Sequence, residues 1–496
     1  SGNTPFETVL ERHVQRRTLI RSGSAMAALS IMSNLGLSAC DSNSNKNNYG
    51  GNGNPVTPPP TPPVTEKPVL GFQSIAGSRT DAIVVPESYR ASILAPWGTP
   101  LNDQAAAWKA DGTNTAQDQA NSVGMHHDGT SFYPLNDSNE DGLLCINHEY
   151  IDQIALHPNG ATVDSETGRR TIVEEIRKEI YAHGVTVVRV RKVDGVWEVV
   201  ANDPHNRRIT GATEMDISGP MASHDLLKTK FSPDGTSARG TFNNCGSGAS
   251  PWGTFLTCEE NWPGYFANTA ERTEDQVRIR LGTTANQYGW NHLAGDESEE
   301  NDEFGRFDVT PTAESALMDY RNEANGHGYI VEIDPYSPDS RPIKRTSMGR
   351  FRHEACEVGK LTAGQPVVFY SGHDAQHEYV YKFVSVANWD PADANRTDRL
   401  AVGDKYLNEG TLYVARFDED GTGVWLPLTM ASVGKKGKPL SDFFGSLAEI
   451  ILNTAGAADE LGATPMDRPE DVEANPTTGR IYIACTRNEN RTVEPG

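Results

Sequence analysis

The feature that most constrains this chain is a succession of short apolar runs, separated by Gly, Asp, Asn and Pro, that begins near residue 83 and continues towards the end of the sequence. Two of these runs, residues 185–190 and 196–200, flank the turn sequence KVDG at 192–195. Apolar runs on both sides of an Asp-Gly turn are typical of a β-hairpin. The pattern therefore predicts many strands joined by tight turns.

The same pattern recurs along the body of the chain. Further strands are expected at residues 329–333, 366–370, 379–384, 412–417, 424–428 and 480–484. Helical periodicity is present only around 171–181 and 442–452. Many short strands with turn residues between them are typical of a sandwich, a barrel or a propeller, and no fixed repeat selects among the three. We predict an all-β fold with a few helical insertions.

The first forty residues have the composition of an export signal. The basic segment 15–21 contains Arg16 and Arg17 and precedes an uncharged, mildly apolar stretch at 22–39. This order is typical of a secretory signal peptide, and the paired arginines favour the twin-arginine route, which carries folded proteins. The sequence LSAC ending at Cys40 resembles a lipobox, in which Cys40 would be lipidated; a chance Cys in an ordinary signal is the alternative. We expect an exported protein, in the periplasm or at the cell surface, with a possible membrane tether through Cys40.

Three domains follow from this composition. Residues 1–39 form the signal peptide. Residues 40–68 are rich in Asn, Ser, Gly, Pro and Thr and cannot bury enough apolar surface to fold, which predicts a disordered tether. Residues 69–496 form the β domain, with 36% hydrophobic and 8% aromatic residues in the whole chain to supply its core.

The charge balance excludes one class of partner. The chain has 44 Lys and Arg against 67 Asp and Glu, a net charge of −23, so we expect no nucleic-acid partner. An acidic chain fits either a soluble carboxylate-rich surface or carboxylate-rich cation sites. The six cysteines are scattered without CxxC spacing, which argues against a zinc ribbon or a small disulfide scaffold. Pairing of Cys245 with Cys258 stays open, since export permits disulfides.

Five segments combine strand-like apolar residues with dense Cys, His, Glu, Asp, Asn and Arg: 143–150, 255–262, 349–357, 369–383 and 467–475. In the first, strand alternation places Cys145, Asn147 and Glu149 on one face, a ligand-like set, although a buried Cys is often structural. The acidic sequence 137–142 just upstream begins like a calcium loop. Its closing Glu falls one position late, so a hairpin turn is the better interpretation.

The other segments add carboxylates and one arginine. Glu259 and Glu260 are adjacent on a strand and point in opposite directions, so only one of them enters a site. Arg352 shares a strand face with Glu354, and an arginine among carboxylates suits bidentate binding of phosphate, with an ordinary ion pair as the alternative. Four further acidic residues lie in turns or at a strand start, namely Asp374, Glu378 and the pair Glu470 and Asp471 presented by Pro469.

Several common catalytic motifs are absent from the sequence: GxSxG, a Walker loop, a GxGxxG and HExxH. The abundant oxygen ligands favour calcium. A thiolate among them indicates a second, softer or redox-capable metal, for which iron is the better candidate and zinc the alternative.

These segments resemble the PhoX-type alkaline phosphatases. The matching stretches are CINHEY (145–150), TCEENW (257–262), HGYIVEIDPYSP (327–338), GRFRHEACE (349–357), SGHDAQHEYVYKFVS (371–385) and RPEDVEANP (468–476). They span residues 120 to 490 in the family's order, behind a twin-arginine signal that the family also carries.

The resemblance implies a six-bladed β-propeller with a site in its central channel, a cluster of Fe3+ and Ca2+, and hydrolysis of small phosphomonoesters for phosphate acquisition. Cys145 would be the thiolate ligand of iron, and Arg352 would hold the phosphate, with Glu259 as the other catalytic candidate. The carboxylate candidates for the metals are Glu149, Glu259, Glu260, Glu354, Glu357, Asp374, Glu378, Glu470 and Asp471. Cations would neutralise the phosphate, and a metal-bound oxygen would be the nucleophile. The twin-arginine translocase would be a partner, and we expect a monomer.

Two departures from the family pattern are present. His126 and His127 stand where many relatives have Asn near the phosphate, which leaves the role of both open. The sequence also ends at Gly496, shortly after the RPEDVEANP stretch, so we expect a propeller that lacks its C-terminal strands. The alternatives are a calcium-binding propeller without catalysis and a related propeller phosphodiesterase, phytase-like hydrolase or lactonase.

Overall fold

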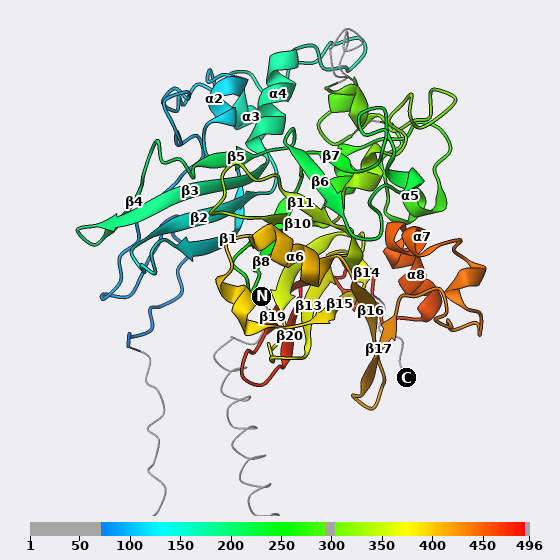
Figure 1. Cartoon of the computed structure of the whole chain (residues 1–496). Coiled ribbons are helices and arrows are strands. Elements are labelled where there is room, and N and C mark those ends of the chain that lie inside the picture. Colours follow the sequence, from blue (N-terminus) through cyan, green and yellow to red (C-terminus); the bar gives the residue numbers. More distant parts are fainter. Residues whose placement is uncertain (1–70, 285, 293–302, 492–496) are drawn as a thin grey trace, which may run out of the picture. The chain divides into compact units, whose positions relative to one another are not determined.

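The computed structural model describes residues 71–284, 286–292 and 303–491 (Figure 1). The predicted signal, Cys40 and the tether lie outside this range. The chain divides into two units, residues 1–79 and 80–496. Of the first unit, residues 71–79 are described, and they are exposed and contain neither helix nor strand. Among the helices described here, none is long and apolar enough to span a membrane.

The strands of the second unit form three large sheets and two strand pairs. The first sheet has the order β1 (His127–Pro134), β2 (Asp141–His148), β3 (Gly184–Val193), β4 (Val196–Val199), and β5 (Arg207–Ile209) also pairs with β3. The second sheet has the order β7 (Ser237–Arg239), β6 (Glu214–Ser218), β11 (Ile343–Arg345), β10 (Ile330–Ile333), β9 (Phe255–Glu259), β8 (Asn244–Ala249). Its β6–β11 pair is parallel, and its other pairs are antiparallel.

The third sheet has the order β12 (His353–Val358), β13 (Pro366–His373), β15 (Val380–Asn388), β16 (Gly410–Phe417), β17 (Gly423–Pro427). The two pairs are β14 (Gln376–Glu378) with β18 (Met466–Asp467), and β19 (Pro469–Ala474) with β20 (Ile481–Cys485). The helices are short: α2 (Ala116–Ala120), α3 (Gln153–Leu156), α4 (Val173–Ala182), α5 (Glu274–Arg278), α6 (Arg399–Leu407), α7 (Leu447–Leu452) and α8 (Thr454–Leu461).

Most of the predicted elements are confirmed. The predicted turn joins β3 to β4, with Asp194 and Gly195 both at positive φ (48° and 81°), as a two-residue hairpin of this hand requires. Residues 137–140 lie in the turn between the antiparallel strands β1 and β2, and Asp141 and Gly142 begin β2, so the hairpin interpretation of 137–142 is confirmed. The coarse fold class is also confirmed, since the described residues form several sheets with few helices and no closed barrel.

Four strands at the ends of their sheets or pairs lie side by side, and three of them, β1, β8 and β19, are labelled in Figure 1. β1, β8, β12 and β19 are each terminal in their sheet or pair. Along this series, β1 packs against β8, β8 against β12, and β12 against β19. Because polar residues at the ends of these strands face a common region, strands far apart in the sequence contribute to one site.

Two glycines allow β8 and β12 to approach each other closely. β8 has glycine at every second position, Gly246 and Gly248. A Cβ at Gly246 would lie 2.5 Å from the Ala355 backbone nitrogen, and one at Gly248 would lie 1.9 Å from the Cys356 carbonyl oxygen. Any larger residue would push β8 away from β12.

Candidate metal centre

A thiol and four carboxylates converge at these strand ends. Potential ligand atoms of Asp128, Glu149 and Cys245 lie within 4.8 Å of one another, and so do those of Cys245, Glu260 and Glu354. Asp128 is on β1, Cys245 on β8 and Glu354 on β12, while Glu149 directly follows β2 and Glu260 directly follows β9. Cys245 belongs to both groups and is therefore the centre of the set, which we call the Cys245 cluster.

The electrostatics of the Cys245 cluster oppose ionisation of its members. Burial raises the pKa of Glu354 to about 8, and the nearby charges of Asp128 and Asp374 add to the effect. Burial and the charges of Asp128 and Asp374 likewise raise the pKa of Glu149 to about 7. Burial, then the charge of Glu354, raises the pKa of Glu260 well above its ordinary value.

This donor set fits bound cations. Burial and the carboxylates around it raise the pKa of the Cys245 thiol, whose Sγ donates to Asp128 Oδ2 at 3.3 Å. Acidic groups that raise one another's pKa can all ionise together only if positive charge is supplied. Carboxylate oxygens suit calcium, and a thiolate suits a softer metal such as iron. The residues present therefore fit a mixed metal cluster.

Asn147 fixes the backbone that carries the thiol. Its Nδ2 donates to the carbonyl oxygens of Cys245 at 2.5 Å and Gly246 at 3.0 Å. Its Oδ1 accepts from Thr257 Oγ1 at 2.8 Å. The predicted ligand-like face of β2 thus contributes a positioning amide at this point.

Arg352 faces a cleft of about 410 Å³ beside the Cys245 cluster, in a lining that also includes Glu260 and Asp374. Its Nη1 donates to Asn261 Oδ1 at 2.6 Å, and its Nη2 donates to the Ile279 carbonyl oxygen at 3.3 Å. The same Asn261 donates through Nδ2 to Glu260 Oε1 at 2.6 Å. One side-chain amide therefore orients both the guanidinium and a carboxylate of the cluster.

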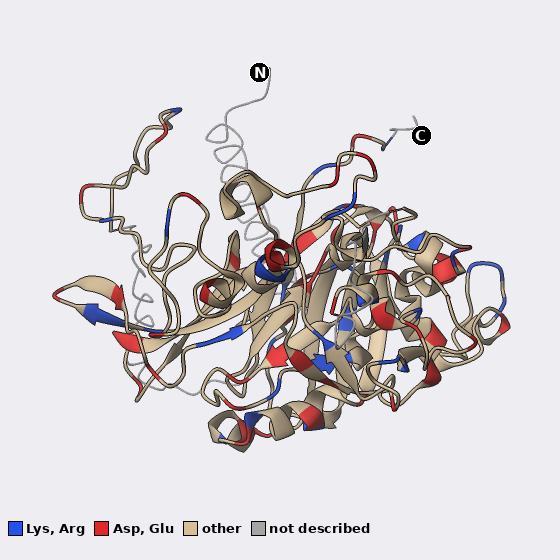
Figure 2. Ribbon diagram, turned by 90° about the horizontal axis from the view of Figure 1, so that it is seen from above, with Lys and Arg blue, Asp and Glu red and all other residues tan. Residues whose placement is uncertain are grey.

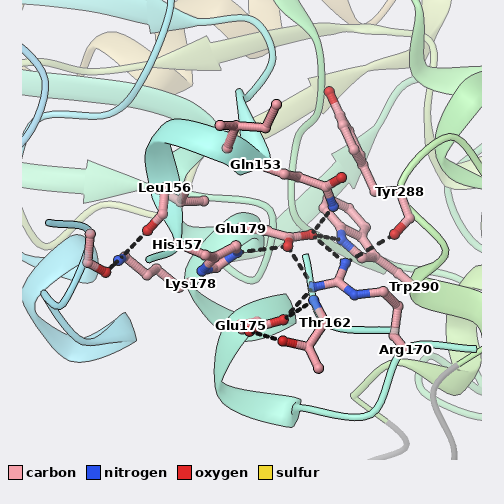
Figure 3. Close-up of polar contacts among 12 residues, drawn as sticks. Gln153, Leu156, His157, Thr162, Arg170, Glu175, Lys178, Glu179, Tyr288 and Trp290 are labelled. Carbon is pink, nitrogen blue, oxygen red and sulfur yellow. Dashed lines mark hydrogen bonds and ion pairs between the residues drawn. The ribbon is translucent and has the colours of Figure 1, made fainter. Parts of the chain in front are cut away.

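A buried network holds the segment around Tyr288 (Figure 3), a residue that lines a neighbouring cavity together with Arg352. Glu179 of α4 accepts from Arg170 Nη2 at 2.6 Å, from Trp290 Nε1 at 2.6 Å and from His157 Nε2 at 2.8 Å. Arg170 Nη1 also donates to the Tyr288 carbonyl oxygen at 3.0 Å. Burial opposes ionisation of Glu179, but the hydrogen bonds from His157 and Arg170 outweigh it and keep its pKa below the ordinary value. The charged carboxylate thus anchors this segment from behind.

The structure does not bring Cys145 into the Cys245 cluster. Cys145 is fully buried on β2 in an apolar group with Val187, Phe255 and Val331. Residues 145 and 149 share a strand face, but four residues of strand separate them by about 13 Å. The thiol beside the carboxylates is Cys245, which corrects the placement expected from the sequence. All five cysteines in the described residues, Cys258 included, are free thiols.

Glu259 also lies apart from the cluster. As expected, Glu259 and Glu260 point in opposite directions, and Glu260 is the one at the site. Glu259 is fully buried, and its Oε1 accepts from Lys344 Nζ at 2.6 Å. Burial alone would raise the pKa of Glu259, but Lys344 and His327 hold it at about 2. Its role in the structure is therefore an internal ion pair behind the strand end.

The remaining predicted carboxylates divide into two sets. Asp374 and Glu470 lie at the rim, where Arg468 Nε donates to Asp374 Oδ1 at 2.9 Å and Arg468 Nη2 lies 3.0 Å from Glu470 Oε1. None of these five residues is among the ligand atoms gathered around Cys245, and Glu378, Glu357 and Asp471 form the second set. Glu378 is paired with Arg278, whose Nη2 donates to Glu378 Oε2 at 2.9 Å. Glu357 has the charges of Glu473 and Asp471 near it; burial and these charges raise its pKa to about 7.

The two histidines differ in position. His126 stacks on Tyr150 with ring centroids 3.9 Å apart and has a positive φ of 48°. His127 packs edge-on against His148, with centroids 5.0 Å apart. Neither belongs to the groups within ligand distance of one another.

Sequence reasoning missed four residues: Cys245 and Asp128 of the cluster, Asn261, and Arg280, which also lines the cleft. One signal was available for Cys245, because it is followed by alternating glycines in the sequence NNCGSGA (243–249), and such glycines indicate a strand whose backbone approaches another closely. Acidic and basic residues are interspersed over the ribbon (Figure 2), so overall charge did not mark the site.

Clustered acidic ligands beside an oriented guanidinium in one cleft define the class of metal-dependent phosphatases, in which cations and arginine together bind a phosphate group. The family comparison gives the particular member of that class. The profile of the family described as alkaline phosphatase PhoX matches residues 70–495. The chain belongs to the PhoX alkaline phosphatase family and is a phosphatase.

A solved structure agrees with this assignment. The chain is similar to Pseudomonas fluorescens PhoX in complex with vanadate, a transition state analogue, with 35% sequence identity and a TM-score of 0.72. The match covers 84% of this chain and 67% of that chain. No curated protein matches the chain.

Proposed function

We propose that this phosphatase hydrolyses small phosphomonoesters at an iron–calcium cluster held by Cys245, Asp128, Glu149, Glu260 and Glu354. The observation that carries the proposal is the convergence of one thiol and four carboxylates beside Arg352. The thiol of Cys245 would hold Fe3+, and the surrounding carboxylates would hold Ca2+ and complete the iron site.

The chain's own residues bind and orient the phosphate. When bound, the cations would neutralise the phosphate charge and make phosphorus more electrophilic. Arg352 donates its remaining N–H groups to phosphate oxygens, where negative charge accumulates in the transition state. Asn261 and the Ile279 carbonyl hold the guanidinium in place before substrate arrives, so little orientation is lost on binding. The buried Glu259–Lys344 pair stabilises the strand end that carries Glu260.

The arrangement of edge strands supports a six-bladed propeller around this site. The three sheets and the β19–β20 pair each present one terminal strand, β1, β8, β12 or β19, to the same region. Innermost strands that surround a common channel are the geometry of a propeller. A crystal structure of the protein would count the blades directly.

Export is proposed from the N-terminal sequence. Arg16 and Arg17 would direct the folded, metal-loaded protein to the twin-arginine translocase, and Cys40 would anchor it after cleavage. Phosphate acquisition outside the cytoplasm is the corresponding role. Replacement of both arginines by lysine should retain the protein in the cytoplasm, and Cys40→Ala should release it from the membrane; fractionation measures both.

The direct test combines metal analysis with hydrolysis of p-nitrophenyl phosphate. We expect iron and calcium in the purified protein and loss of activity with a calcium chelator. Arg352→Gln should lower kcat/KM by a factor of about 100 or more while the metal content stays. The exposed Arg396 pairs with Asp398 outside the cleft, so Arg396→Gln is a matched control. Protein that contains calcium but shows no hydrolysis would favour a purely binding propeller, and preference for bis(p-nitrophenyl) phosphate would favour a phosphodiesterase.

A further inference from the structure

A second cavity, of about 340 Å³, adjoins the cleft and shares Asn261, Arg280 and Arg352 with it. Its lining consists of these two arginines, three side-chain amides, two tyrosines and a glycine. No carboxylate lines it, although the chain carries a net charge of −23. The two hollows therefore differ in chemistry: arginines and carboxylates both line the first, whereas the second has two arginines, no carboxylate and many hydrogen-bonding groups.

Arg280 carries a charge that reaches the carboxylate of Glu378 only at a distance, where it opposes the rise in pKa that burial causes. Its exposed side chain makes no hydrogen bond or ion pair with another described residue, whereas Arg278, two positions earlier, is paired with Glu378 and Asp459. Burial lowers the pKa of Arg352, and the nearby charge of Arg280 lowers it further. Two guanidinium groups that repel each other across one cavity favour an anion between or beside them.

The backbone at Arg280 is unfavourable for arginine. Arg280 follows the C-cap residue Ile279 of α5 and has a φ of 62°. Helices often end with one left-handed residue at this position, and it is usually glycine because a Cβ is strained there. At this position, Arg280 directs a long cationic side chain into a cavity beside the phosphate-binding arginine. The unfavourable backbone conformation therefore indicates that the side chain has a binding role.

We propose that this cavity receives the leaving group of the phosphoester and that Arg280 binds a second anionic group on it, a carboxylate or a further phosphate. The inference rests on the proposed function, because it takes the transferred phosphate to lie at Arg352 beside the Cys245 cluster. Arg352 lines both hollows. A phosphate held there can extend its ester group away from the carboxylates, which would repel an anion, and toward Arg280. Tyr150 and Tyr288 supply the apolar faces and hydroxyls that accompany a polar organic group.

The test uses two substrates that differ only in the distal charge: 4-carboxyphenyl phosphate and its methyl ester. In the unmodified enzyme, kcat/KM should favour the carboxylate. Arg280→Gln should reduce the ratio of the two kcat/KM values about tenfold, since a charge-assisted hydrogen bond is lost. Arg396→Gln should leave the ratio unchanged. An unaltered ratio in Arg280→Gln would overturn the proposal, and so would an equal loss with both substrates, which would place Arg280 on the transferred phosphate instead.

A binding measurement separates this proposal from the proposed function. Calorimetry with 4-carboxyphenylphosphonate and its methyl ester, neither of which can be hydrolysed, should show the same tenfold change in relative affinity. Absence of hydrolysis of p-nitrophenyl phosphate would contradict the proposed function, while the phosphonate affinities would still decide the role of Arg280. Arg280→Gly should lose the selectivity and keep or raise the midpoint of thermal unfolding, because glycine relieves the left-handed strain. A lowered midpoint would mean that Arg280 serves the fold, and would overturn the proposal.

Discussion

Cys145 is buried and Cys245 is partly exposed, and of the two only Cys245 has carboxylate oxygens within ligand distance of its sulfur. We therefore predict that Cys245→Ala loses iron and most activity while the metal-free protein unfolds at an unchanged denaturant midpoint. Iron content by mass spectrometry and urea unfolding of the metal-free protein measure the two effects.

Cys145→Ala is the matched comparison. This substitution removes a sulfur from a packed apolar group, so we expect about 1–2 kcal/mol lower unfolding free energy with iron retained. If Cys145→Ala lost iron and Cys245→Ala kept it, Cys145 would be the thiolate ligand of iron, as expected from the sequence, and the Cys245 cluster would not be the iron site.

The raised carboxyl pKa values give the metal-free protein a distinctive pH dependence. In the unfolded chain a glutamate ionises near its ordinary pKa of 4.5, whereas Glu149 and Glu354 in the folded protein ionise near pH 7 and pH 8. Between these values the folded state retains protons that the unfolded state has released, so stability falls as the pH rises. We predict that metal-free protein loses on the order of a few kcal/mol of stability from pH 5 to pH 8.

Urea unfolding at several pH values measures this effect. Glu354→Gln should flatten the decline, because the amide does not ionise, and bound cations should reverse it, because they require ionised ligands. A metal-free protein whose stability rose between pH 5 and pH 8 would contradict the electrostatic picture of the cluster.

At the residue scale, strand alternation predicted the strand face on which each side chain lies, but not the residues that it contacts in the fold. It placed Glu149 on a site-facing side and separated Glu260 from Glu259, and both features are present in the structure. It could not rank Cys145 against Cys245, because the choice depends on which strands pack against each other. Asn147, expected as a ligand-like group, instead fixes the Cys245 backbone through contacts about 100 residues away in sequence.

At the element scale, β8 determines whether the ligand strands can meet. Gly248 faces β12 so closely that an added methyl would collide with the Cys356 carbonyl. We predict that Gly248→Ala lowers the unfolding free energy by about 2 kcal/mol or more and weakens metal binding, since β8 carries Cys245. Gly77, which has no atom within 4 Å of its added Cβ, gives the control Gly77→Ala. Equal stability and metal content in the two variants would show that β8 can move without disturbing the site.

The sequence predicted those elements that are specified by neighbouring residues, such as a turn sequence or a helical periodicity. The hairpin at 192–195 and the helix around 171–181 have their turn residues or periodicity within a few positions, and β3–β4 and α4 confirm them. α8 was missed because its sequence TAGAADEL has no clear apolar stripe. The contacts of β8 with β1 and β12 join segments about 100 residues apart, and no short pattern specifies such packing.

At the scale of the whole molecule, the Cys245 cluster joins three sheets. Asp128 and Glu149 come from the first sheet, Cys245 and Glu260 from the second, and Glu354 from the third. Because these carboxylates repel one another without a cation, the edges of the sheets are held together most firmly when metal is bound. Metal should therefore stabilise the fold as well as support activity.

Addition of a strong chelator should lower the midpoint of thermal unfolding, and restoring calcium at about one hundred times its Kd should return about 3 kcal/mol of stability. Glu354→Gln removes a ligand of the cluster and should abolish most of this calcium-dependent gain, whereas Glu357→Gln should preserve it, because Glu357 lies near Glu473 and Asp471 instead. Differential scanning calorimetry with and without chelator measures the gain in each variant. If the unmodified protein showed no change on chelation, or if Glu357→Gln removed the gain while Glu354→Gln kept it, the cations would have to bind outside the Cys245 cluster.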